Sequence, residues 1–120
     1  MLVYAYRITK NKAYLEGALS NLDYLLRRNA TGYCFVTGFG TFSPMHPHHS
    51  PSEADGIAEP IPGLLAGGPN PGMQDKCCYL FTEPETAYSD VACSYASNEI
   101  AINWNAAAVY LFSAVDALGR

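Results

Sequence analysis

The stretch YSDVACSYASNEIAINWNA, residues 88–106, decides how this chain folds and what it can do. It places two acids, Asp90 and Glu99, at the mouth of a strongly apolar segment that we expect to be helical from about Asn98 to Leu118. An acid at this position either favours the helix dipole or takes part in chemistry. From the residues alone, the favoured interpretation of Glu99 is a first-turn acid and Asp90 could be a turn residue, while a catalytic role for the two acids stays open.

The apolar segment after Glu99 has no polar face. One stripe at helical spacing is joined by further apolar residues on the other sides, and the two sets are Trp104, Ala108, Leu111, Val115, Leu118 and Ile102, Val109, Tyr110, Phe112, Ala114. A helix that is apolar all round is normally buried all round. We therefore expect an inner helix of a two-layered helical assembly.

Two further helices are predicted before residue 30. Residues 1–9 have the composition of a helix, residues 9–12 form a polar turn, and Asn11 is a suitable N-cap for the next helix. From residue 13 to 28 a single apolar stripe recurs at helical spacing: Leu15, Ala18, Leu19, Leu22, Leu25 and Leu26. Asn29-Ala30-Thr31 is a glycosylation sequon, but its simpler interpretation is a helix stop.

Residues 33–87 show little periodicity and contain most of the 8 prolines and 10 glycines. A connection of this length is usually functional or disordered. Its aromatic and aliphatic residues favour an ordered, packed loop, and such loops often carry binding sites. The fold class predicted here is all-α, with about three helices and long ordered loops.

The four cysteines do not match a zinc pattern. A bridge from Cys77 or Cys78 to Cys93 would close a loop of about 15 residues and contribute about 3 kcal/mol in the chain-entropy model. Four unpaired buried thiols, including Cys34, are the alternative, and the spacing does not decide between them.

Composition excludes several classes of function. A net charge of −4 with 7 Lys plus Arg leaves no basic stripe for nucleic acid. The apolar runs are too short to span a bilayer, and residues 1–7 lack the features of a signal peptide. Only 15% of the residues are charged and 49% are apolar, so a chain of 120 residues can hardly cover its own helices. We therefore expect either a homo-oligomer or a piece of a larger fold.

All three histidines lie in TGFGTFSPMHPHH, residues 37–49. Imidazoles are common metal ligands, but the H-x-H-H spacing in a proline-rich loop matches no standard site. Hydrogen bonding to a polar substrate or to loop carbonyls is the favoured interpretation, and no metal or other cofactor is predicted.

The chain resembles the C-terminal part of the family-9 glycoside hydrolases, the inverting endo-β-1,4-glucanases. The family's pattern aromatic-x-Asp-x4-aromatic-x3-Glu-x-Ala-x3-Asn-Ala is met in full by Tyr88, Asp90, Tyr95, Glu99, Ala101, Asn105 and Ala106. The earlier segments TGFG, PHH, PSEADG and PIPGLLAGGPNPG are similar to its active-site loops.

The resemblance implies part of an (α/α)6 barrel, its C-terminal quarter, within one domain covering residues 1–120. It implies that Glu99 is the general acid, that Asp90 is the other acid of the signature and that His48 is the active-site histidine. It further implies a β-1,4-glucan substrate, a secreted protein, and substrate contacts from His49, Phe39, Gly67, Gly68 and Trp104. Of the disulfide alternatives, Cys77–Cys93 is the one we adopt.

Three departures from the family pattern weaken this expectation. Ser50 stands where the family has a sugar-binding arginine, and Phe42 stands where a polar residue is expected. The family's base comes from an Asp-Ala-Gly-Asp motif that does not occur in these residues. An active enzyme would need a base from Asp90, Asp55 or a neighbouring subunit. The alternative is a catalytically impaired chain that at most binds glucan.

Overall fold

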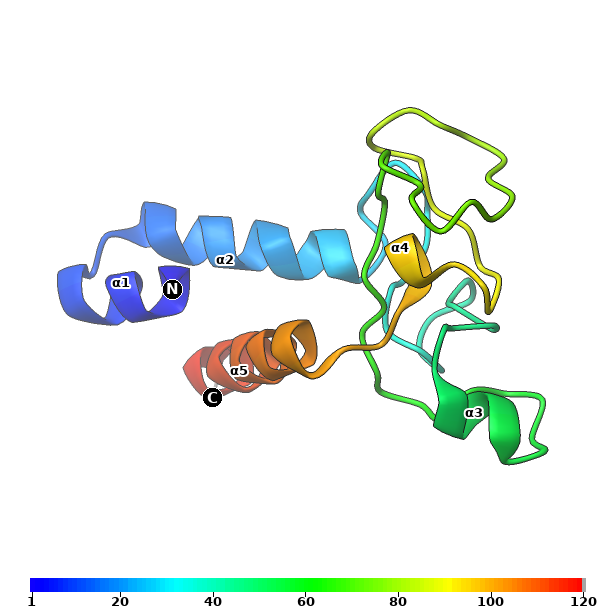
Figure 1. Cartoon of the computed structure of the whole chain (residues 1–120). Coiled ribbons are helices and arrows are strands. Elements are labelled where there is room, and N and C mark those ends of the chain that lie inside the picture. Colours follow the sequence, from blue (N-terminus) through cyan, green and yellow to red (C-terminus); the bar gives the residue numbers. More distant parts are fainter. Residues whose placement is uncertain (120) are drawn as a thin grey trace.

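A computed structural model of the chain describes residues 1–119 (Figure 1). It contains five helices: α1 (Leu2–Thr9), α2 (Lys12–Leu25), α3 (Ser50–Ala54), α4 (Tyr95–Asn98) and α5 (Ile102–Gly119). No strand forms within this range, although four isolated β-bridges join distant loop segments. The protein is therefore helical, as expected, with three helices of eight residues or more and two short ones that the periodicity did not indicate.

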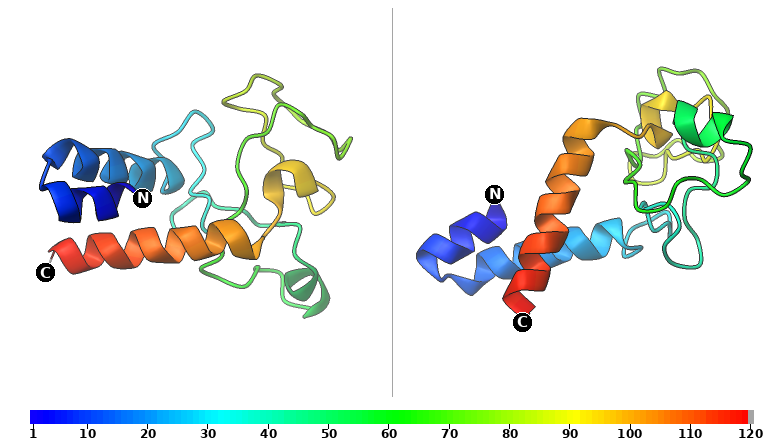
Figure 2. Two further views of the ribbon diagram at one scale, coloured as in Figure 1. Left: turned by 60° about the vertical axis from the view of Figure 1, so that its left-hand side comes forward. Right: turned by 90° about the horizontal axis from the view of Figure 1, so that it is seen from below.

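The three longer helices form one side of the molecule and the loops form the other (Figures 1 and 2). Lys10 ends α1 in the left-handed conformation, and Asn11 then caps α2 because its side chain accepts a hydrogen bond from Ala13 N at 3.0 Å. The chain turns sharply between these two helices, so α1 lies against α2. Helix α5 returns beside both, and the two termini lie on the helical side.

Helix α2 ends at Leu25, three residues before the predicted end at residue 28, and Asn29 lies in the turn that follows. Its side-chain amide donates to the carbonyls of Tyr24 and Tyr33, and its oxygen accepts from the Thr31 and Gly32 N–H groups. Because both ends of this amide are engaged, Asn29 stabilises the turn that follows α2 rather than ending the helix itself.

The core lies where the helices meet the loops. It is built from Cys34, Phe35, Val36, Leu65, Tyr88 and Ala108. Phe35 is 1% exposed and meets the Tyr88 ring edge-on at 5.2 Å between centroids. Two antiparallel bridges, Leu26 with Cys34 and Val36 with Leu65, tie this core to the end of α2 and to the loop 63–68.

The long loop is ordered through close backbone contacts. Gly38 has a φ of 73°, and a Cβ at this position would lie 2.7 Å from the Pro62 side chain. Thr37, with 0% exposure, accepts a hydrogen bond from Leu64 N and donates one to the Ile61 carbonyl. The prediction that residues 33–87 form a packed loop rather than a disordered linker is therefore confirmed.

The predicted single helix over residues 98–118 is wrong at its beginning. Helix α4 ends at Asn98, Glu99 has an extended conformation with φ −70° and ψ 143°, and α5 begins at Ile102. Glu99 is thus outside the first turn of α5, and its interpretation as a helix-dipole residue fails. The backbone between the two helices bonds to other loops instead of continuing the helix.

The expectation that the last helix is buried on every side is also wrong for this chain by itself. In α5 only Ala108 is buried, and Ile102 and Val109 are 90% and 64% exposed. The accessible surface is 7442 Å², whereas a compact 13.0 kDa protein exposes about 6,300 Å². The described helices include none that could cross a membrane.

Cys77 and Cys93 form a disulfide, with their Cα atoms 6.2 Å apart. Cys34 is a buried free thiol, and Cys78 is an exposed one. The bridge ties the loop after residue 70 to the segment that precedes α4. The adopted pairing therefore agrees with the structure.

Candidate active site

His48 and Glu99 are held side by side by their backbones. They pair in a parallel β-bridge in which His48 N donates to the Asn98 carbonyl at 2.9 Å and Ile100 N donates to the His48 carbonyl at 3.3 Å. Residues paired in this way direct their side chains to the same face. The structure thus joins the proline-rich histidine loop to the helix break, 51 residues later in the chain.

The imidazole of His48 has a defined orientation. Its Nδ1 lies 2.6 Å from the carbonyl oxygen of Ala92. A carbonyl oxygen can only accept, so Nδ1 carries the proton of this bond and Nε2 of the neutral ring is left as an acceptor. The Tyr95 ring meets the imidazole edge-on at 6.2 Å. His48 is exposed, so its Nε2 is available to a ligand hydroxyl.

Asp90 is an anchor of the histidine loop. Its two carboxylate oxygens accept hydrogen bonds from Met45 N at 2.8 Å and His46 N at 2.9 Å, and one of them also accepts from the Asn98 side chain at 3.1 Å. Charge-assisted bonds of this kind are the strong ones in proteins. With both oxygens engaged, Asp90 is poorly placed to activate a water molecule.

The carboxylate of Glu99, unlike that of Asp90, is not engaged by neighbouring donors among the described residues. Glu99 is half-buried, and within residues 1–119 no group donates a hydrogen bond to its carboxylate. Its backbone carbonyl accepts from Gly67 N at 3.1 Å, and the preceding helix is held because Gly68 N donates to the Ser97 carbonyl at 2.8 Å. The side chain of Glu99 is therefore free while its backbone is fixed.

The two glycines predicted to contact substrate have a structural role here. Their N–H groups are used to hold Ser97 and Glu99, and Gly68 has a φ of 94°. A Cβ on Gly67 would lie 3.2 Å from the Ser97 carbonyl oxygen. The close approach of the Ser97 carbonyl favours glycine at residue 67, and the positive φ favours it at residue 68. Through these hydrogen bonds the two glycines fix the backbone of Glu99.

A second acid, Asp75, holds the short helix α4. Its carboxylate accepts from Tyr79 OH at 2.7 Å, from Ser94 OH at 3.0 Å, and from the N–H groups of Ala96 and Cys77, both at 3.0 Å. Burial raises the pKa of Asp75, but these hydrogen bonds outweigh it and leave the pKa below its usual value. Local sequence patterns do not predict this role for Asp75, because two of its four partners, Ser94 and Ala96, follow it by 19 and 21 residues.

His49 and Phe39 lie in the same loop region but take no part in the backbone bridge between His48 and Glu99. His49 Nδ1 is 2.9 Å from Ser52 Oγ, and Phe39 is 55% exposed on the turn between Gly38 and Gly40. Phe42 packs on Tyr33 with ring centroids 3.9 Å apart. An aromatic contact thus takes the place of the polar group expected at residue 42.

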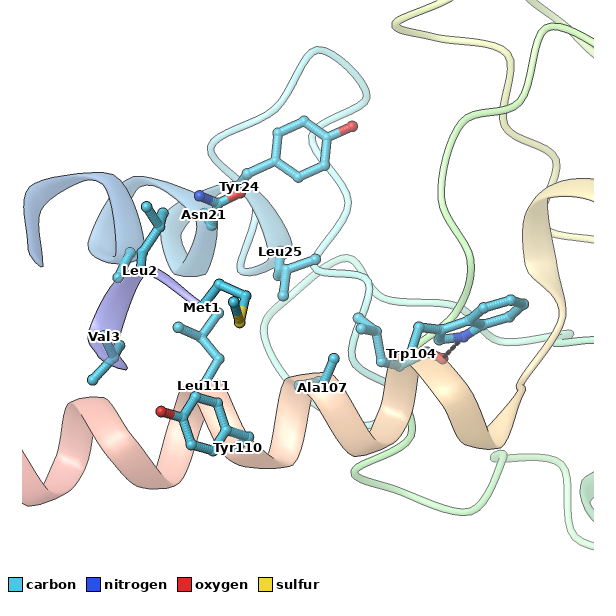
Figure 3. A pocket seen from close by; sticks show the side chains of 13 residues that line it. Met1, Leu2, Val3, Asn21, Tyr24, Leu25, Trp104, Ala107, Tyr110 and Leu111 are labelled. Carbon is cyan, nitrogen blue, oxygen red and sulfur yellow. Dashed lines mark hydrogen bonds between the residues drawn. The ribbon is translucent and has the colours of Figure 1, made fainter. Parts of the chain in front are cut away.

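Trp104 lies on the helical side of the molecule. Its Nε1 donates to the Leu65 carbonyl at 3.0 Å, and its ring lines a groove of about 540 Å³ between α1, α2 and α5 (Figure 3). The next residue, Asn105, accepts from Leu65 N and donates to its carbonyl. This placement favours packing over glucan contact for Trp104.

The three histidines do not form a metal centre. Within the described part of the chain, no three His, Cys, Asp or Glu side chains come close enough together to hold an ion. His46 contributes its backbone to the loop, and His48 and His49 point to different partners. The hydrogen-bonding interpretation of the histidine loop is the one that this geometry supports.

Comparison with known proteins relates the whole chain to one family. The family described as Glycosyl hydrolase family 9 matches residues 1–112. The xyloglucan-specific endo-beta-1,4-glucanase BoGH9A of Bacteroides ovatus is 58% identical over 117 residues, which is 98% of this chain and 20% of that protein. Endoglucanase D of Acetivibrio thermocellus is 42% identical over 110 residues, covering 92% of this chain and 16% of its own length.

A solved structure, Bacteroides ovatus GH9, superimposes with a TM-score of 0.88 and 53% identity. The match covers 99% of this chain and 20% of that one. The chain therefore spans about a fifth of the length of the relatives it matches.

Proposed function

Because the chain belongs to glycosyl hydrolase family 9, whose matched relatives are endoglucanases, we propose that it hydrolyses β-1,4-glucosidic bonds with Glu99 as the general acid. The bridge that sets Glu99 beside His48 is the observation that carries this proposal. Residues 1–119 are proposed to form part of an (α/α)6 barrel.

The proposed chemistry is of the inverting type. One carboxyl group protonates the glycosidic oxygen while a second carboxylate activates a water molecule on the opposite face, about 6.5–9.5 Å away. Within residues 1–119 the Glu99 carboxyl receives no hydrogen bond from another group, so the carboxyl is free to approach the glycosidic oxygen. His48, fixed by the Ala92 carbonyl, can accept a hydrogen bond from a hydroxyl group of the sugar next to that bond.

The inverting mechanism also needs a general base, and three sources are considered for it. Asp90 was one candidate, but its carboxylate is engaged by two backbone N–H groups. Within residues 1–119, Asp55 accepts one hydrogen bond, from Ile57 N at 2.9 Å, and a neighbouring subunit is a further candidate source. The engagement of Asp90 favours a second candidate function, in which the chain binds glucan and turns it over slowly or not at all.

One pair of measurements separates these two functions. The purified chain is mixed with xyloglucan and with carboxymethylcellulose, and both the release of reducing ends and the binding of soluble oligosaccharides are followed. Xyloglucan is included because the 58% identical relative is named for it. Hydrolysis supports the first function, and binding without release supports the second. Neither binding nor release would contradict both.

We also propose that a second copy of the chain covers the exposed side of α1, α2 and α5. The accessible surface of 7442 Å² is about 1,100 Å² larger than expected for this mass, and a stable interface takes about 800 Å² from each partner. Large apolar side chains are exposed on this side: Tyr4, Ile8, Ile102, Val109 and Tyr110. Helix α5 contributes only one charged residue among 18.

A further inference from the structure

Asn98 is buried at the point where the three segments of the candidate site meet. It has 0% exposure. Its side-chain Nδ2 donates to the His46 carbonyl at 2.8 Å and to Asp90 Oδ1 at 3.1 Å. Its Oδ1 accepts from the hydroxyl of Tyr88. One carboxamide therefore links the histidine loop, the 88–90 segment and helix α4.

The backbone of Asn98 reaches both residues of the proposed site. Its N–H donates to the Ser94 carbonyl at 2.8 Å within α4, and its carbonyl accepts from His48 N at 2.9 Å. Glu99 is the next residue in the chain. A displacement of Asn98 would thus move Glu99 directly and His48 through one hydrogen bond.

The partners of this side chain require an amide. The Asp90 carboxylate and the His46 carbonyl only accept, so the atom between them must donate twice. Tyr88 donates to the other end, because burial first, and then the charge of Asp90 and the neighbouring Tyr33, raise the pKa of its hydroxyl and keep it protonated. An aspartate or a serine at residue 98 would leave at least one of these groups without its partner.

We propose that Asn98 is a positioning residue that sets the relative placement of the His48 imidazole and the Glu99 carboxyl. It touches neither substrate nor the reacting atoms and acts through the two neighbours. This role rests on the proposed function, because His48 and Glu99 are the residues proposed to act on glucan. It also explains why Asp90 belongs to the same signature as Glu99: Asp90 accepts one of the two Asn98 bonds.

The substitution Asn98→Asp tests this directly because it keeps the shape and removes the donor. At about pH 8 it would set a second carboxylate against Asp90, whereas at about pH 5.5 two close carboxylates share a proton and a donor returns. The titratable groups around residue 98 are Tyr88, Asp90, His46, His48 and Glu99. Asn70→Asp is the matched control, since Asn70 also donates to α4, at the Ala96 carbonyl, and bonds no acid.

The measurement is amide hydrogen exchange in the purified chain, with oligosaccharide affinity measured in parallel. In Asn98→Asp we expect the His48 and Met45 amides to exchange at least about tenfold faster than in the wild type at pH 8, with a smaller gap at pH 5.5. The core amides of Phe35 and Thr37 should change much less, and Asn70→Asp should leave the His48 and Met45 amides unchanged.

Wild-type exchange at His48 and Met45 in Asn98→Asp would overturn the proposal. So would an equal acceleration of all core amides, because it would show a general loss of stability. If Asn98→Asp does not fold, Asn98→Ser is measured in the same way, with the same amides expected to accelerate. Exchange needs no ligand, so a chain that binds no glucan would contradict the proposed function while this test still decides the role of Asn98.

Discussion

His48 and Glu99 pair through their backbones although 50 residues separate them in the chain. Within residues 1–119 no group donates a hydrogen bond to the Glu99 carboxyl, and the His48 imidazole is held on the Ala92 carbonyl. Four residues around this pair form hydrogen bonds to other protein groups: Asp90, Gly67, Gly68 and Asn98. We infer that the two acids have different roles. Glu99 is available for chemistry, whereas Asp90 holds the histidine loop in place.

Asp90→Asn should destabilise the histidine loop. The substitution replaces one carboxylate oxygen with an NH2 group that faces a backbone donor, at Met45 or His46. The loss of a hydrogen bond to a charged group costs about 1.5–3 kcal/mol, and we expect a fall of about this size in the unfolding free energy from urea titration. An Asp90→Asn chain as stable as the wild type would contradict the anchoring role.

Asp75 should make the fold sensitive to acid. Its pKa is lowered in the folded state, so its stabilising effect is complete above the unfolded value of about 3.9 and is lost as the pH falls through the lower, folded value. Asp75→Asn should therefore be less stable at neutral pH and show a weaker decline below about pH 4. Thermal melts of both chains from neutral to acid pH measure this, and parallel curves would disprove it.

The Cys77–Cys93 disulfide should contribute to stability. It closes a loop with a sequence separation of 16, and the chain-entropy model assigns about 3 kcal/mol to a loop of this size. Replacing both residues by serine should lower the unfolding free energy by about that amount. The control Cys78→Ser removes the neighbouring exposed thiol and should change little. Equal effects of the two changes would argue against the bridge.

The helical side should mediate self-association. We expect light scattering to give the mass of at least two chains, and Val109→Lys together with Ile102→Lys to reduce it to one, because each places a charge on the exposed face of α5. Ile57→Lys is the control, since Ile57 is 62% exposed but follows α3 on the loop side (Figure 1). A monomeric wild-type mass would contradict the proposal.

Local patterns predicted the first two helices and missed the break before the last one. The stripe in residues 13–28 and the Asn11 cap depend on near neighbours, so the bounds of α2 could be predicted to within a few residues. Residues 99–101 contain no glycine or proline that would end a helix, yet the backbone groups of Glu99 and Ile100 bond to Gly67 and His48. Those partners are more than 30 residues away, beyond the reach of periodicity.

The same limit applies to the acids of the signature. Its spacing identified Glu99 and Asp90 together, but the separation of their roles depends on the donors that face Asp90, which come from residues 44 and 45 positions earlier. Asn98 and Asp75 were missed for this reason. The position of an asparagine directly before a candidate acid is a signal in the sequence that could have drawn attention to residue 98.

Glu99 is proposed to donate the proton to the leaving group. This role is tested most directly by comparing wild type and Glu99→Gln on two substrates, an oligosaccharide and an aryl glucoside whose leaving group needs no protonation. General acid catalysis contributes about 10²–10⁴-fold, so Glu99→Gln should lose about that factor on the oligosaccharide and far less on the aryl glucoside. Equal losses on both substrates, or no loss on either, would contradict the claim.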